Sequence, residues 1–125
     1  MKRFAIAASI TAALVLSSAA LAGATLVGKY TANVASPAAL KGTWTLTFAK
    51  AGTYAVADQG HIVIRGKYST LGSKVSLGHE TGPAACPTGA TYSWKRSGKT
   101  LKLTRIKDTC AGRTTVLAHT FTQSG

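Results

Sequence analysis

The chain has very few acidic residues: Asp58, Glu80 and Asp108 are the only three among 125. Catalysis by paired carboxylates therefore has little material to work with, and no Ser/His/Asp pattern is evident along the chain. Asp108 is expected to order its own turn or to pair with Arg113. We expect no enzymatic activity and no cofactor.

Cysteine is equally scarce, with Cys86 and Cys110 as the only two. Neither belongs to a C-x-x-C motif or has a histidine beside it, which argues against a metal site or a redox motif. Only one pairing is available, so in an oxidising compartment we expect a Cys86–Cys110 disulfide. A cross-link over a loop of this length stabilises a fold by about 3–4 kcal/mol on the chain-entropy model.

Long apolar runs are confined to the N-terminus. Met1-Lys2-Arg3 is basic, residues 4–22 are apolar or small, and Ala20-Leu21-Ala22 ends the segment with small residues. This layout predicts a secretory signal peptide over residues 1–22, with cleavage after Ala24 as an alternative. A membrane anchor would need about 20 apolar residues and a basic flank on its far side. We expect export, with no transmembrane segment in the mature chain.

Negative charge is scarce enough to leave the chain strongly basic, at +12. Because Lys2 and Arg3 leave with the signal peptide, the mature chain carries +10. Such a field attracts acidic polymers or an anionic surface, although the charge also serves solubility alone. Apart from the pair Lys95-Arg96, the basic residues of the mature chain are spread as singlets, and we expect no sequence-specific binding of nucleic acid. We also expect a monomer.

Helical periodicity is missing from the mature chain, apart from one helical turn expected at residues 37–40. After a short leader at residues 23–28, residues 29–125 form one domain in which apolar and polar residues alternate between Gly-rich turns. This period of two predicts β-strands. The eight expected strands are 29–34, 42–49, 53–57, 61–70, 74–80, 90–96, 100–107 and 114–122.

One apolar row per strand makes a continuous apolar face that no helix covers. The sheet must therefore close on itself or pack as a sandwich. Short hairpins favour a small eight-stranded antiparallel up-and-down barrel, and a sandwich is the second choice. The interior is expected to be lined by Trp44, Phe48, Tyr54, Ile62, Ile64, Tyr68, Tyr92, Trp94 and Leu103. A barrel of this size is either filled by these side chains or holds one small ligand.

Four segments resemble a known group of proteins: Gly42-Thr43-Trp44 opening a strand, Gly82-Pro-Ala-Ala-Cys86, Tyr92-Ser-Trp94, and Asp108-Thr-Cys-Ala-Gly-Arg113. Together they are similar to the calycin superfamily and to small bacterial lipocalin-like exported proteins of unassigned activity. The resemblance implies that Trp44 packs near the closed end of the barrel beneath Arg113 from the last strand. It also makes His119 the candidate for an axial haem ligand. The longer loops and C-terminal helix of large lipocalins are not expected here.

Two functions follow from these expectations. The first is capture of a small apolar or aromatic molecule inside the barrel, with the tyrosines as polar groups. The alternative is a solid basic barrel that binds acidic envelope polymers or a protein partner. That alternative includes inhibition of a hydrolase through the loop at residues 82–88, which could equally be a rigid connection.

Overall fold

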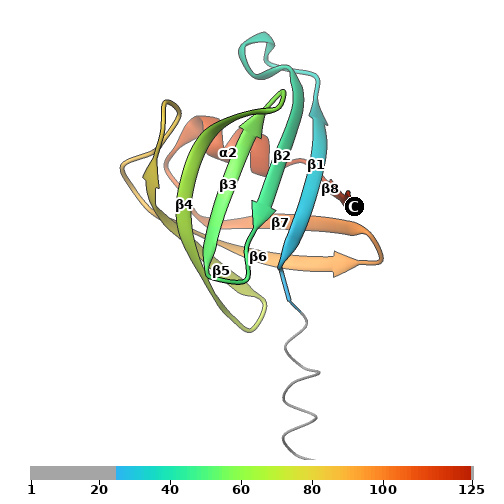
Figure 1. The fold of residues 1–125 in the computed structure, drawn as a ribbon, viewed down its shortest axis with the longest axis vertical. Coiled ribbons are helices and arrows are strands. Elements are labelled where there is room, and N and C mark those ends of the chain that lie inside the picture. The colour runs from blue at the N-terminus through green and yellow to red at the C-terminus, as the bar shows by residue number, and fades with distance from the viewer. Residues whose placement is uncertain (1–24, 125) are drawn as a thin grey trace, which may run out of the picture.

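The computed structural model describes residues 25–124 as an eight-stranded closed antiparallel barrel (Figure 1). This confirms the predicted fold class. The predicted signal peptide, residues 1–22, lies outside the described residues. The elements, in order, are β1 (Gly28–Val34), η1 (Ala38–Leu40), β2 (Gly42–Phe48), β3 (Thr53–Asp58), β4 (His61–Leu71), β5 (Lys74–Thr81), β6 (Ala90–Ser97), β7 (Thr100–Lys107), α2 (Ala111–Leu117) and β8 (Phe121–Gln123).

Each strand pairs with its neighbour in the chain, and β8 closes the barrel. Tyr30 of β1 lies opposite Gln123, and Leu101 of β7 lies opposite Phe121. β8 is only three residues long, so it pairs with two residues of β1 and with two residues of β7.

The connections alternate between the two ends of the barrel. The helix end carries the β1–β2, β3–β4 and β5–β6 connections and the segment with α2 between β7 and β8. The hairpin end carries the β2–β3, β4–β5 and β6–β7 turns and the start of β1. Figure 1 draws the helix end in the upper part of the view, and the β4–β5 turn and the start of β1 below.

The core lies inside the barrel and is built from one face of each long strand. Alternate residues of β2, such as Trp44, Leu46 and Phe48, are buried, while the threonines between them are only half-buried. The N-terminal leader contributes as well, because Leu26 is 1% exposed and accepts a hydrogen bond from the Tyr30 hydroxyl at 2.9 Å. The core of the barrel therefore includes Leu26, which precedes the start of β1 by two residues.

The expected last strand, residues 114–122, is wrong. Residues 111–117 form the helix α2, and only Phe121–Gln123 form a strand. β-Branched residues at 114–116 favour a strand locally. Two of them support the helix instead, because the hydroxyls of Thr114 and Thr115 both donate to the Ala111 carbonyl, at 2.9 and 3.0 Å.

The expected inward position of Ile62 is also wrong. Val56 pairs with Ile64, but the next residue, Ala57, pairs with Ile62, so Val63 is an extra residue in β4. A bulge of this kind shifts the alternation of faces by one residue. Ile62 is consequently 47% exposed, whereas Ile64 is buried in the core.

Candidate functional site

A buried charge cluster lies at the helix end, centred on Arg113 of α2. Its Nε and one terminal nitrogen donate to the two carboxylate oxygens of Asp108, at 2.8 and 2.7 Å. The other terminal nitrogen donates to Glu80 of β5 at 3.0 Å, and the Thr88 carbonyl accepts a further bond at 2.9 Å. The side chains of Glu80 and Asp108 are fully buried. Two carboxylates thus share one guanidinium out of contact with water.

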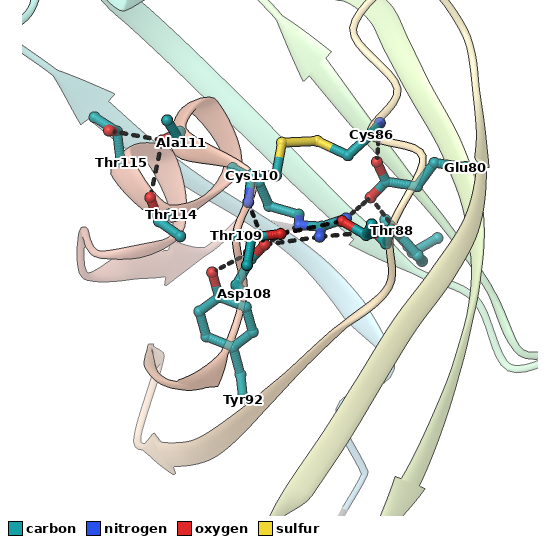
Figure 2. Close-up of a disulfide and its surroundings, with 12 residues drawn as sticks. Glu80, Cys86, Thr88, Tyr92, Asp108, Thr109, Cys110, Ala111, Thr114 and Thr115 are labelled. Carbon is teal, nitrogen blue, oxygen red and sulfur yellow. Dashed lines mark hydrogen bonds and ion pairs between the residues drawn. A yellow bond between two sulfur atoms is a disulfide. The ribbon is translucent and has the colours of Figure 1, made fainter.

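Neighbouring donors saturate both carboxylates. Glu80 accepts from the Tyr54 hydroxyl and, at 2.8 Å, from the backbone N–H of Cys86. Asp108 accepts from the Tyr92 hydroxyl at 2.5 Å and from the backbone N–H of Cys110 at 3.0 Å. Figure 2 shows the Cys86–Cys110 disulfide lying beside both carboxylates. The predicted disulfide is confirmed. Through the N–H groups of Cys86 and Cys110, the carboxylates of the cluster hold both cysteines against the barrel wall.

The hydrogen bonds outweigh the effect of burial on the charged groups. Burial alone would raise the pKa of Asp108, but hydrogen bonds from Arg113, Tyr92 and the Cys110 N–H hold that pKa below its usual range. Burial alone would lower the pKa of Arg113, but its bonds to Asp108 and Glu80 raise it. The pKa values of Tyr54 and Tyr92 are raised by burial and further by their carboxylate partners. Asp108 and Arg113 therefore remain charged at neutral pH.

A cavity of about 90 Å³ adjoins this cluster. Its polar boundary is Glu80 and Arg113, and the disulfide lies along one side. The remaining lining is mostly apolar and comes from Leu40, Trp44, Leu46, Tyr54, Val56, Ile64, Leu77, Ala84, Gly112, Val116 and Leu117. Two of these residues, Ala84 and Gly112, are exposed, so the cavity lies close beneath the surface between the β5–β6 loop and the start of α2.

Apart from Ile62, which is exposed, the predicted lining residues divide into two groups. Trp44, Tyr54 and Ile64 line the cavity. The other five belong to the core or pack against it without lining the cavity: Phe48, Tyr68, Tyr92, Trp94 and Leu103. Phe48 contacts Tyr68 edge-on, with ring centroids 4.8 Å apart, and these rings fill the barrel toward its hairpin end.

Trp44 and Arg113 both line the cavity, but Arg113 belongs to α2 and not to the last strand. Its guanidinium is directed to carboxylates instead of to the indole. The cation–π contact found within residues 25–124 is that of Arg96 with Tyr30, 5.6 Å from the ring centroid. Trp44 is fixed separately, because its indole N–H donates to the Leu40 carbonyl at 2.7 Å.

The site has few free groups for chemistry. The oxygens of Glu80 and Asp108 are all occupied, as expected for Asp108, which both orders its turn and pairs with Arg113. Residues 25–124 contain no group of three His, Cys, Asp or Glu residues placed to hold a metal. His119, the haem candidate, is not among the cavity-lining residues, and its Nδ1 lies 3.0 Å from the Thr115 carbonyl. The arrangement favours enclosure of an apolar molecule.

The 82–88 loop is tied back onto the barrel. The N–H of Ala84 donates to the Val63 carbonyl at 3.1 Å, and Cys86 is held by both Glu80 and the disulfide. Gly82 has a φ of +113°, and a Cβ there would lie 2.4 Å from the Val63 oxygen, so this position requires glycine. The loop therefore serves as a rigid connection that walls the cavity.

Comparison of the chain with known protein families, with curated proteins and with solved structures finds no match in any of the three. Across residues 25–124, no helix has the length and apolar composition that crossing a bilayer requires.

Sequence reasoning missed Glu80 as a partner of Arg113 and missed α2 as a wall of the cavity. A signal for the first was available. The chain has only three acidic residues, so any one of them that folds close to a basic residue of a buried segment is a candidate for an ion pair with that residue. The second had a weak signal, because the buried residues of α2 are spaced as 113, 116 and 117, the spacing of one helix face.

Proposed function

We propose that this protein is exported and binds one small, uncharged, apolar or aromatic molecule in the cavity at the helix end. The observation that carries the proposal is an apolar cavity whose only charged neighbours are already paired with each other. We also propose that it acts without catalysis, as a monomer, and that its likeness to calycins reflects distant kinship.

The size of the cavity supports this proposal. One water molecule occupies roughly 30 Å³ in the liquid, and apolar cavities of about 150 Å³ bind benzene. A volume of about 90 Å³ exceeds one or two waters and approaches the space of a single small ring. Larger ligands would require α2 to move outward.

The polarity of the lining indicates the class of ligand. Trp44 presents its ring to the cavity while its N–H is bound to Leu40, and the carboxylates are saturated. A ligand that needed hydrogen bonds would lose those it makes to water without replacement, at a cost of about 1–3 kcal/mol for each. An aliphatic or aromatic ligand has no such loss.

Native mass spectrometry of protein purified from its own host tests the proposal, together with NMR titration by indole, toluene and short alcohols. We expect a co-purified molecule or shifts at the methyl groups of Ile64, Val116 and Leu117. Val116→Phe should fill the cavity and abolish the shifts, whereas Ala118→Leu, at the exposed residue directly after α2, should not. Absence of any shift in the folded parent protein would contradict the proposal.

The alternative, a solid basic barrel acting through its outer surface, is less well supported because the helix end contains the cavity. Hydrolase inhibition through the 82–88 loop is disfavoured by the bonds that hold that loop to β4 and Glu80. The basic surface itself still needs an explanation.

A further inference from the structure

The barrel is electrically polarised along its axis. All three carboxylates of the chain lie at the helix end: Asp58 ends β3, Glu80 lies near the end of β5, and Asp108 follows β7. Eight of the thirteen basic residues in the described part lie in the half of the barrel nearest the hairpin end, namely Lys29, Lys50, Lys67, Lys74, Lys95, Arg96, Lys99 and Lys102. Within residues 25–124, the hairpin end is therefore a cationic surface without an acidic side chain.

Three of these lysines are neighbours on the outer face of adjacent strands. Lys95 of β6 lies directly opposite Lys102 of β7, and Lys74 of β5 pairs with Ser93, two residues before Lys95. Directly opposite residues have Cβ atoms about 5 Å apart, and diagonal neighbours about 7–8 Å. All three side chains are exposed. Like charges at these distances repel each other, and an anionic partner would reduce this repulsion.

An exposed apolar side chain lies at the same end. Leu71, the last residue of β4 before the β4–β5 turn, is 84% exposed, more than the other exposed large apolar residues of the described chain, Ile62 and Ile106. It lies opposite Lys74 in the hairpin register. A single exposed leucine is ordinary, but Leu71 beside Lys74 combines apolar surface with positive charge, and the two together favour binding to an anionic lipid interface.

The N-terminus of the described chain reaches the same end. The turns at Gly72 and Gly98 and residue Thr25 border a common hollow, and Arg96 donates to the Thr25 carbonyl at 3.1 Å. Residues 4–22, which precede this point by only two residues, are the apolar segment of the sequence.

From these observations we propose that the hairpin end docks on an anionic lipid bilayer, with Leu71 in the interface and Lys74, Lys95 and Lys102 against the headgroups. The inference depends on the export proposed above and is independent of the cavity. The positive charge is concentrated at one end of the barrel and does not follow a groove. This distribution matches a flat membrane surface that meets the barrel end-on. A soluble polymer would make no use of Leu71.

The test measures partitioning of the exported form, which lacks the leader, onto vesicles of phosphatidylglycerol and phosphatidylcholine, because residues 25–124 form a closed barrel with its own core and disulfide. Each lysine near an anionic surface contributes about fivefold to binding. We therefore expect the triple variant Lys74→Gln, Lys95→Gln, Lys102→Gln to bind on the order of a hundredfold more weakly. Leu71→Ser should weaken binding roughly fivefold to tenfold.

Matched variants at the helix end serve as controls. Ile106→Ser and the triple variant Lys41→Gln, Arg65→Gln, Lys107→Gln change exposed residues of the same kinds, and we expect them to retain most of the binding. Binding should fall steeply with salt and be weak on phosphatidylcholine alone, because the attraction is screened. Val116→Phe should bind vesicles normally, which separates this test from that of the cavity.

Two results would overturn the proposal. One is equal loss of binding in the helix-end and hairpin-end triple variants, which would indicate attraction by net charge alone. The other is binding to vesicles and to a soluble polyanion such as heparin with equal affinity and no effect of Leu71→Ser, which would indicate a polymer partner. Trp94 fluorescence adds a second readout: this half-buried residue borders the hollow at the hairpin end, so docking should protect it from iodide quenching in a Trp44→Phe background.

Discussion

At the helix end, a guanidinium and two carboxylates are buried together and saturated by hydrogen bonds. At the hairpin end, by contrast, seven lysines are exposed, and none of the acidic side chains of residues 25–124 lies at that end. The same residue types thus have opposite consequences in the two places. Arg113 is indispensable because removing it leaves buried charge unpaired. Repulsion among the hairpin-end lysines slightly lowers the stability of the fold, and their exposed side chains are accessible to a partner. Substitutions at the two ends should therefore differ in sign as well as in size.

The largest expected effect is that of Arg113→Met. The substitution leaves Glu80 and Asp108 buried without a cation, and breaking a buried ion pair in this way costs about 3–5 kcal/mol. Urea denaturation followed by tryptophan fluorescence measures the loss. The exposed residue Arg105 provides the control, because Arg105→Met should change stability by less than about 0.5 kcal/mol. Equal effects of the two substitutions would show that the cluster does not stabilise the fold.

Removal of the disulfide comes next. The double variant Cys86→Ser, Cys110→Ser should lower the free energy of unfolding by about 2–4 kcal/mol, mainly because the unfolded chain is no longer cross-linked. Denaturation of the parent protein with and without a reducing agent gives an independent measure, and the two should agree. A loss below that range would mean that the charge cluster alone holds the 82–88 loop against α2.

Acid should affect the helix end by a smaller amount. The pKa of Asp108 is lower in the folded than in the unfolded protein, so its contribution is present above the unfolded value of about 3.9 and is lost as pH falls through the folded value. We expect the parent protein to lose about 1–2 kcal/mol more than Asp108→Asn between pH 5 and pH 2. Denaturation midpoints across this range measure the difference, and parallel curves would contradict it.

The smallest expected effect has the opposite sign. Lys95→Thr removes one of two like charges that face each other across β6 and β7 and introduces a residue favoured in strands. We expect a gain of about 0.2–1 kcal/mol at low salt, smaller at high salt. Lys67→Thr, on a strand where the opposite residue is Gly78, is the control and should give no salt-dependent gain. A loss of stability in Lys95→Thr would contradict the contrast between the two ends.

Most of the barrel was predictable because alternation is a local property of the chain. Seven of the expected strands lie within one or two residues of the observed ones. The errors arose where a nonlocal contact overrode the local pattern. Residues 114–116 have β-branched side chains but form part of a helix, because Arg113, Val116 and Leu117 are buried on one face of it. Ile62 faces outward because a bulge in β4 shifts the alternation of faces by one residue. The amino-acid composition of the strand does not reveal this bulge.

The sequence by itself determined the number of long apolar rows, the single available disulfide and the excess of positive charge, because each depends only on which residues are present and in what order. The tertiary structure alone decided which charges are buried. It brought Glu80 of β5 and Asp108 after β7 onto the same guanidinium, left the lysines of three strands side by side, and placed a cavity beneath α2. Such contacts join residues that are far apart in the chain. Arg113 and Glu80, for example, are 33 positions apart. Spatial proximity of that kind follows from how the barrel closes, and local patterning does not encode it.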